Sequence, residues 1–161
     1  MANKIVSNTG PIIHLNEINF LEVLDIFSSV FIPEEVANEL KKNNVLILRK
    51  IKIIKLTSES KDKVKIITNE YNLDLGEAEA ITLALQEKID YFITDDLEAR
   101  KIAKKYFIEV HGTIGVVLRA LKEKLIDKKT AIEKVNELKT KSSLFITQDL
   151  INEITKAISE F

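Results

Sequence analysis

Short apolar runs alternate along the chain with longer segments whose apolar positions recur every three or four residues. The short runs predict β-strands at 5–6, 30–32, 51–56, 90–94 and 108–111. The longer segments predict helices, because this spacing places apolar side chains on one helix face. Strands that alternate with helices are typical of α/β proteins. We therefore expect a three-layer α/β/α sandwich around a central, mainly parallel sheet.

Proline and polar residues mark several helix boundaries. Pro11 suits the first turn of a helix that we expect to reach about residue 27, with an interruption near Asn19.

The tail predicts two more helices, so we expect a main domain over 1–126 and a C-terminal helical extension over 127–161, packed on the same domain. The other expected helices cover 33–44, 60–71, 76–86, 95–106 and 114–124.

Composition narrows the class of protein. The chain has 161 residues, 45% of them hydrophobic, and a formal net charge of -1, which excludes a globally basic nucleic-acid binder but not a local basic patch. It has no cysteine, so disulfides and thiolate metal sites are excluded. No apolar run approaches the length of about 20 residues that a membrane span needs, and no signal-peptide pattern precedes the first strand. We expect a cytoplasmic protein that is not bound to a membrane.

Polar side chains follow two of the expected strands. Asn8 comes directly after the first strand, and Asp95 and Asp96 come after the strand at 90–94. In a parallel sheet these strand ends lie on one edge, where α/β proteins bind ligands. Oxygen ligands that converge there suit a hard cation such as Mg2+ or Mn2+, and two such ions can assist phosphodiester cleavage.

Three acids on helices are further candidates. Glu39 follows Pro33, whereas Glu77 and Glu79 stand on the first turn of an Ala-rich helix and point in different directions. One of this pair can face the sheet edge while the other faces solvent. Acids near a helix N-terminus also stabilise the helix without any function, and the residue pattern alone favours that interpretation.

Five segments, in this order, resemble the PIN-domain superfamily, in particular its VapC-like, predicted nucleic-acid-binding branch. They are "IVSNTGPIIHL", "IPEEVANEL", "LGEAEAITLAL", "FITDDLEARKIAKKY" and "VHGTIGVVLRALKEKLI". The resemblance implies a Mg2+- or Mn2+-dependent endoribonuclease that acts on RNA, and the toxin of a toxin–antitoxin pair. It also implies a small antitoxin protein as a partner, and a homodimer.

Carried over by motif, the resemblance assigns the catalytic and metal-binding acid positions to Asn8, Glu39, Glu79 and Asp96. Asp95 is an adjacent candidate for the metal, and the auxiliary residues are Glu77, Thr94 and Arg100.

Asn8 departs from the family pattern, which usually has Asp at this position. An amide oxygen still ligates hard cations but brings no charge, so weaker metal binding is expected unless Asp95 or Glu77 turns inward. The alternative is a catalytically weak or inactive PIN-fold module that binds nucleic acid or protein. A receiver-type phosphoacceptor domain ranks below both, because the acidic pair comes late in the chain.

Two smaller features complete the sequence-based expectations. Thr9 is expected to cap the first helix, and Gly112-Thr113 opens another helix, either as a plain turn or as a phosphate site. His14 and His111 have no ligand partner nearby in the sequence, so neither is assigned to a metal.

Overall fold

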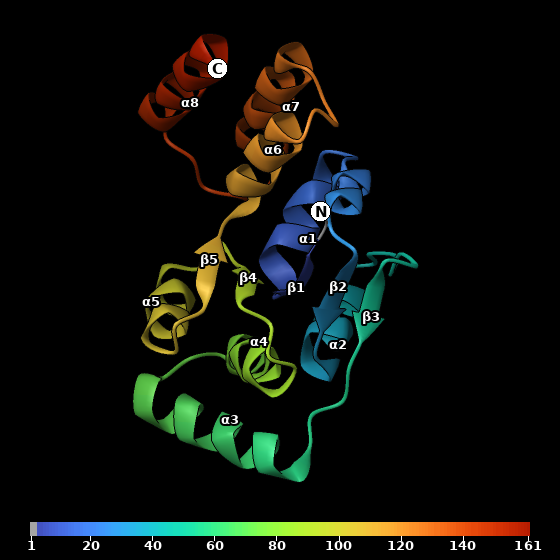
Figure 1. The fold of residues 1–161 in the computed structure, drawn as a ribbon, viewed down its shortest axis with the longest axis vertical. Coiled ribbons are helices and arrows are strands. Elements are labelled where there is room, and N and C mark those ends of the chain that lie inside the picture. Colours follow the sequence, from blue (N-terminus) through green and yellow to red (C-terminus); the bar gives the residue numbers. More distant parts are fainter. Residues whose placement is uncertain (1–2) are drawn as a thin grey trace.

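The computed structural model describes residues 3–161 and contains a five-stranded sheet with helices on both faces (Figure 1). The strand order is β3-β2-β1-β4-β5, and all four neighbouring pairs are parallel. The predicted α/β sandwich is therefore confirmed. The strands are β1 (Lys4–Ser7), β2 (Ser29–Ile32), β3 (Ile51–Ile53), β4 (Tyr91–Ile93) and β5 (Glu109–His111).

Eight α-helices and one 3-10 helix connect and follow these strands within the described residues. The α-helices are α1 (Thr9–Glu17), α2 (Glu34–Lys42), α3 (Ser58–Tyr71), α4 (Leu75–Gln86), α5 (Leu97–Lys105), α6 (Thr113–Lys122), α7 (Lys128–Lys141) and α8 (Gln148–Glu160), and the 3-10 helix is η1 (Leu21–Ile26). None of them has the length and apolar character that a membrane crossing requires.

The sheet separates two hydrophobic cores. Neighbouring residues of a strand point to opposite faces, so Ile5 enters the core formed with α1, α2, α6, α7 and α8, whereas Val6 enters the core formed with α3, α4 and α5. Ile93 and Phe92 of β4 divide in the same way. Figure 1 shows α3 and α4 at one end of the molecule and α7 and α8 at the other. Burial on both faces explains why the strands are short, continuous apolar runs.

Strand order places the expected ligand edge between β1 and β4. The chain runs from β1 to β2 and β3 on one side, and then crosses to β4 and β5 on the other. Backbone bonds continue past the strand ends, from Asn8 N to Ile93 O (3.3 Å) and from Thr94 N to His111 O (2.9 Å). The residues that follow β1 and β4 are therefore held side by side at the point where α/β sheets open a crevice.

Two elements differ from their sequence-based predictions. The first helix is interrupted as expected, at Asn19, whose φ is 51°, but the segment after it is 3-10 rather than α-helix. The strand expected over 51–56 ends at Ile53, since β3 is an edge strand whose Lys52 and Ile53 are exposed. The last ladder bond runs from Ile54 N to Ile32 O (3.0 Å), and the chain then turns toward α3.

The C-terminal helices share a core with the first helix. Buried side chains from α7 and α8, such as Val135 and Ile154, belong to the same cluster as Leu15 of α1. Between these helices, Ser143 donates from its backbone N (3.0 Å) and its Oγ (2.7 Å) to Glu17 Oε1. The division of the chain into a main domain over 1–126 and a C-terminal extension over 127–161 stays a prediction.

Candidate active site

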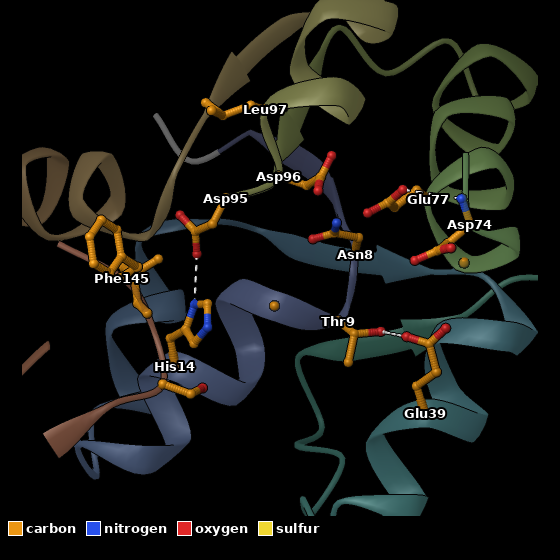
Figure 2. Close-up of a pocket in the computed structure, with 14 residues that line it drawn as sticks. Asn8, Thr9, His14, Glu39, Asp74, Glu77, Asp95, Asp96, Leu97 and Phe145 are labelled. Atoms are coloured by element: carbon orange, nitrogen blue, oxygen red, sulfur yellow. Dashed lines mark hydrogen bonds and ion pairs between the residues drawn. The ribbon is translucent and has the colours of Figure 1, made fainter. Parts of the chain in front are cut away.

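A pocket of about 510 Å3 opens at the shared edge of β1 and β4 (Figure 2). We call it the acid pocket, because five carboxylates line it and no lysine or arginine does, among the described residues. Its lining residues come from five separate parts of the chain: Asn8, Thr9, Gly10, His14, Glu39, Asp74, Gly76, Glu77, Asp95, Asp96, Leu97, Ser143, Leu144 and Phe145.

Asn8 presents an unpaired amide oxygen. Its side-chain nitrogen Nδ2 donates to Thr94 Oγ1 (2.7 Å), which fixes the orientation of the amide. Its Oδ1 is buried and has no hydrogen-bond partner. Leaving such an atom unpaired costs about 1–3 kcal/mol. A ligand in the pocket would remove this cost, and an amide oxygen is a suitable ligand for a hard cation.

Thr94 connects the two strand ends. It is fully buried, and its hydroxyl oxygen also accepts from the backbone N of Asp96 (3.2 Å). Asp96 in turn caps α5, because its Oδ1 accepts from Ala99 N (2.7 Å). Figure 2 shows the side chains of Asn8, Asp96 and Glu77 directed toward one another. The structure thus places Asn8 and Asp96 in one pocket, and their shared function stays a prediction.

Among the residues that line the acid pocket, Glu77 has the carboxyl whose pKa is shifted most. Burial, followed by the negative charges of Asp96 and Asp74, raises the pKa of its carboxyl to about 7, and Glu39 adds a smaller effect in the same direction. The backbone N of Asp74 donates to Glu77 Oε2 (3.3 Å) and partly opposes this rise in pKa. A cation between these acids would relieve their mutual repulsion.

Glu39 reaches the pocket from α2. Its Oε2 accepts a hydrogen bond from the hydroxyl of Thr9, so this hydroxyl does not cap α1 as the sequence suggested. The carboxylate also lies against Gly76, where an added Cβ would stand 2.6 Å from Glu39 Oε1. The glycine at the start of α4 therefore leaves room for the Glu39 carboxylate in its present position.

Asp95 has its oxygens engaged on the other side of the pocket. Its Oδ2 meets His14 Nδ1 at 2.8 Å and accepts from the Thr113 hydroxyl, while its Oδ1 accepts from Thr113 N (2.8 Å). Burial alone would raise the pKa of Asp95, but these hydrogen bonds hold the pKa below its ordinary value. The N-terminus of α6 thus binds an internal carboxylate, in place of the plain turn or the phosphate considered from the sequence.

Arg100 supports the same region from α5. Its Nε donates to the backbone O of Thr94 (3.0 Å), and its Nη2 lies 3.9 Å from Asp95 Oδ1. An added Cβ at Gly112 would collide with this guanidinium, at 2.1 Å from Nη2. Arg100 therefore binds the backbone at the end of β4 and also lies close to Asp95 at the edge of the sheet.

Glu79 lies outside the acid pocket, which corrects the expectation that it would share a pocket with Asn8, Glu39 and Asp96. It lines a second pocket on the other side of α4. The charged groups that affect the pKa of its carboxyl are Glu34, Glu35 and Lys61. Two residues along an α-helix turn the side chain by about 200°. Of the two glutamates in the α4 motif, Glu77 is the one that enters the acid pocket.

The sequence interpretation did not assign Asp74, Phe145 or His14 to the site, although all three line the acid pocket. Asp74, just before α4, lines it next to Glu77, and Phe145 lines it from the loop between α7 and α8. His14 enters from α1, where it is the one basic side chain in the apolar stretch "GPIIHL". That position, one turn after Gly10, was the available signal for His14, whereas nothing local predicted Phe145.

Comparison with known families agrees with this architecture. The family model DUF3368, described as a PIN domain, matches residues 4–160. The chain belongs to the PIN-domain superfamily. The search of curated proteins found no match. PIN domains are generally nucleases, and PIN nucleases usually need divalent metals. The match covers α7 and α8 as well as the sheet.

The donor set of this PIN domain suits a hard divalent cation. It offers the unpaired Asn8 oxygen and the carboxylates of Glu39, Glu77 and Asp96, all of them oxygen donors. As the side chains stand, no three Asp, Glu or His residues within 3–161 are grouped closely enough to hold one ion. Binding therefore requires side-chain rotation, and Glu39 would leave its hydrogen bond with Thr9.

Proposed function

We propose that this PIN domain is a divalent-cation-dependent endoribonuclease whose site is the acid pocket. The observation that carries the proposal is a pocket with five carboxylates, no lysine or arginine among the described lining residues, and an unpaired buried amide oxygen. Such a pocket repels a phosphate by itself and becomes complementary to one only with cations.

Asn8, Glu39, Glu77 and Asp96 are the residues proposed to hold Mg2+ or Mn2+. Glu77 takes the place that the sequence motif gave to Glu79. A divalent cation there would supply charge to a phosphate oxygen and assist the attack of water. Hydrolysis then forms a bond from the water oxygen to phosphorus, breaks the bond to the leaving ribose oxygen and returns a proton to that oxygen. Thr94 acts beside them as a positioning residue for Asn8.

The rim of the pocket supports a nucleic acid as the substrate. Leu97 and Phe145 line the pocket and are 70% and 89% exposed, so they offer apolar surface next to the acids. Unpaired bases of single-stranded RNA stack on aromatic side chains of this kind. A small antitoxin protein, a homodimer and a cytoplasmic location remain predictions of the family resemblance.

The test is cleavage of a single-stranded RNA by purified protein, first in EDTA and then with Mn2+ or Mg2+. We expect cation-dependent cleavage in the wild type and a loss of about 100-fold or more in Asp96→Asn. Asn still caps a helix, so α5 is retained in this variant. Glu98→Gln is the matched control, because Glu98 lies on α5 but pairs with Lys101 at the surface (3.0 Å). Equal activity in Asp96→Asn and the control would refute the proposal.

A PIN-fold binding module without catalysis is the second candidate. It is favoured by the neutral Asn8 and by the lack of three acids grouped around one point within the described residues. Calorimetric titration with Mn2+ separates the two, since a module that binds no ion at millimolar concentration has no route to cation-dependent cleavage. In the nuclease, Asn8→Asp should strengthen Mn2+ binding by about tenfold, because a fourth carboxylate joins the site.

A further inference from the structure

His14 stands on the wall of the acid pocket in a fixed orientation. Its side chain is 12% exposed, and its Nδ1 lies 2.8 Å from Asp95 Oδ2 (Figure 2). The ring packs beside Gly10, where an added Cβ would lie 3.6 Å from His14 Cε1. Asp95 is itself held by Thr113 and by Arg100, as described above. The imidazole is therefore built into the pocket.

The hydrogen bond to Asp95 determines which nitrogen of a neutral His14 carries the proton. A carboxylate only accepts hydrogen bonds, so the proton of a neutral His14 lies on Nδ1 and points at Asp95. His14 Nε2 then offers a lone pair. None of the described residues hydrogen bonds to Nε2, and Nε2 is not among the buried atoms without a partner, so a ligand can reach it.

In the proposed nuclease, the carboxylates that bind the cation and the Asn8 oxygen would be occupied by that cation. The neutral imidazole nitrogen stays available as an acceptor for a hydrogen-bond donor of the substrate. The sugar-phosphate backbone of RNA has one such donor, the ribose 2′-hydroxyl, which DNA lacks.

We propose that His14, positioned by Asp95, accepts a hydrogen bond from a ribose 2′-hydroxyl next to the cleaved phosphate, and that this contact makes the site prefer RNA to DNA. The inference rests on the proposed nuclease function. His14 is thus a specificity-determining residue, and Asp95 and Thr113 are positioning residues that act through it.

His111 provides a matched control within the same chain. Its Nε2 meets Glu109 Oε1 at 2.7 Å, its ring stacks on Tyr91 with centroids 4.5 Å apart, and it does not line the acid pocket. It shares the residue type of His14 but lacks an accessible acceptor in that pocket. The chain has only these two histidines, which also makes their NMR signals simple to assign.

The main test compares binding of an RNA oligonucleotide, the DNA of the same sequence, and the RNA with one 2′-deoxy position at the mapped cleavage site, all in Ca2+. We expect His14→Ala to weaken RNA binding by about 5- to 10-fold and DNA binding by less than twofold, the effect of one lost hydrogen bond. The single 2′-deoxy substitution should reproduce this loss in the wild type and have no further effect in His14→Ala. His111→Ala should bind like the wild type.

A second measurement keeps the inference testable if His14→Ala folds poorly. Long-range 1H–15N spectra of the wild-type histidines should show His14 protonated on Nδ1, and its Nε2 signal should move on adding RNA but not DNA. If His14 proves doubly protonated, or if His14→Ala weakens RNA and DNA binding equally, the contact is to phosphate and the inference is wrong. If the wild type cleaves no RNA with Mn2+, the nuclease proposal fails, and the binding comparison still decides the role of His14.

Discussion

The helices α2 and α4 place carboxylates in two different settings. Glu39 and Glu77 face the acid pocket, whereas Glu35 and Glu79 face the second pocket on the other side of α4. The second pocket also contains two lysines, and we call it the lysine-lined pocket. These lysines are Lys61 and Lys65.

The two settings differ in how their charge is compensated. Burial raises the pKa of Glu79, and the charges of Glu35 and Glu34 add to this rise. A hydrogen bond with the Glu35 backbone and, to a smaller extent, the charge of Lys61 lower the pKa in part. Glu77 is raised to a pKa of about 7, with carboxylates as the charged groups around it. An acidic cluster that includes lysines is a stable surface feature, while one without cations is poised to bind them. The charged groups around Glu77 and Glu79 therefore distinguish a candidate cation site from ordinary surface charge better than a count of acidic residues does.

The largest effect expected from this comparison is on cation binding. Glu77→Gln should weaken Mn2+ binding and slow cation-dependent cleavage by about 100-fold, because it removes a proposed ligand. Glu79→Gln, two residues away on the same helix, should change both by less than twofold. The measurements are calorimetric titration and RNA cleavage with each variant. The reverse order of effects would return the acid position to Glu79, as the sequence motif suggested.

A smaller effect is expected from pH. The pKa of Glu77 is about 7 in the folded protein and ordinary when unfolded, so the folded state retains a proton between about pH 4.5 and 7. Without cations, this group therefore lowers the stability of the protein as the pH rises through that range. A cation must displace the same proton, so Mn2+ affinity should rise by about tenfold per pH unit up to about 7 and then level off. Glu77→Gln should flatten both profiles, as measured by thermal unfolding and by titration.

The smallest effect concerns the glycine that gives Glu39 its place. Gly76→Ala puts a Cβ 2.6 Å from Glu39 Oε1, and the flexible carboxylate can move aside. We expect folding to be retained and Mn2+ affinity to fall by a few-fold, less than the 10- to 100-fold typical of groups that orient metal ligands directly. Gly115→Ala is the control, because its Cβ would meet His111 Cβ at 3.4 Å and Gly115 does not line the acid pocket. Equal affinity in the two variants would show that Glu39 needs no such space.

The fold could be predicted from the sequence because its signals are local. Short apolar runs such as "YFIT" and helices opened by Pro11 and Pro33 define the alternation of strands and helices. That alternation also placed Asn8 and Asp96 on one edge, through the general rule for parallel sheets. The length of β3 was not predictable in this way, since it depends on the position of this strand at the sheet edge.

The candidate site was predictable only in part. Spacing showed that Glu77 and Glu79 diverge, but which one faces the sheet depends on how α4 rotates as its alanines pack in the core. The role of His14 depends on Asp95, which lies 81 residues later. Phe145 lines the rim two residues after Ser143, which binds Glu17 across 126 residues of sequence. Contacts of this range are set by the assembled fold and leave no local pattern.

The bond between Glu17 and Ser143 also bears on the order in which the protein takes shape during synthesis. The chain emerges from the ribosome N-terminus first, so Asn8, Glu39, Glu77 and Asp96 are all outside before Phe145 has been added. During synthesis, the carboxylates of the acid pocket are therefore present well before the segment that Ser143 attaches to Glu17. Residues 143–145, which line one side of the pocket, are added only after all of its carboxylates.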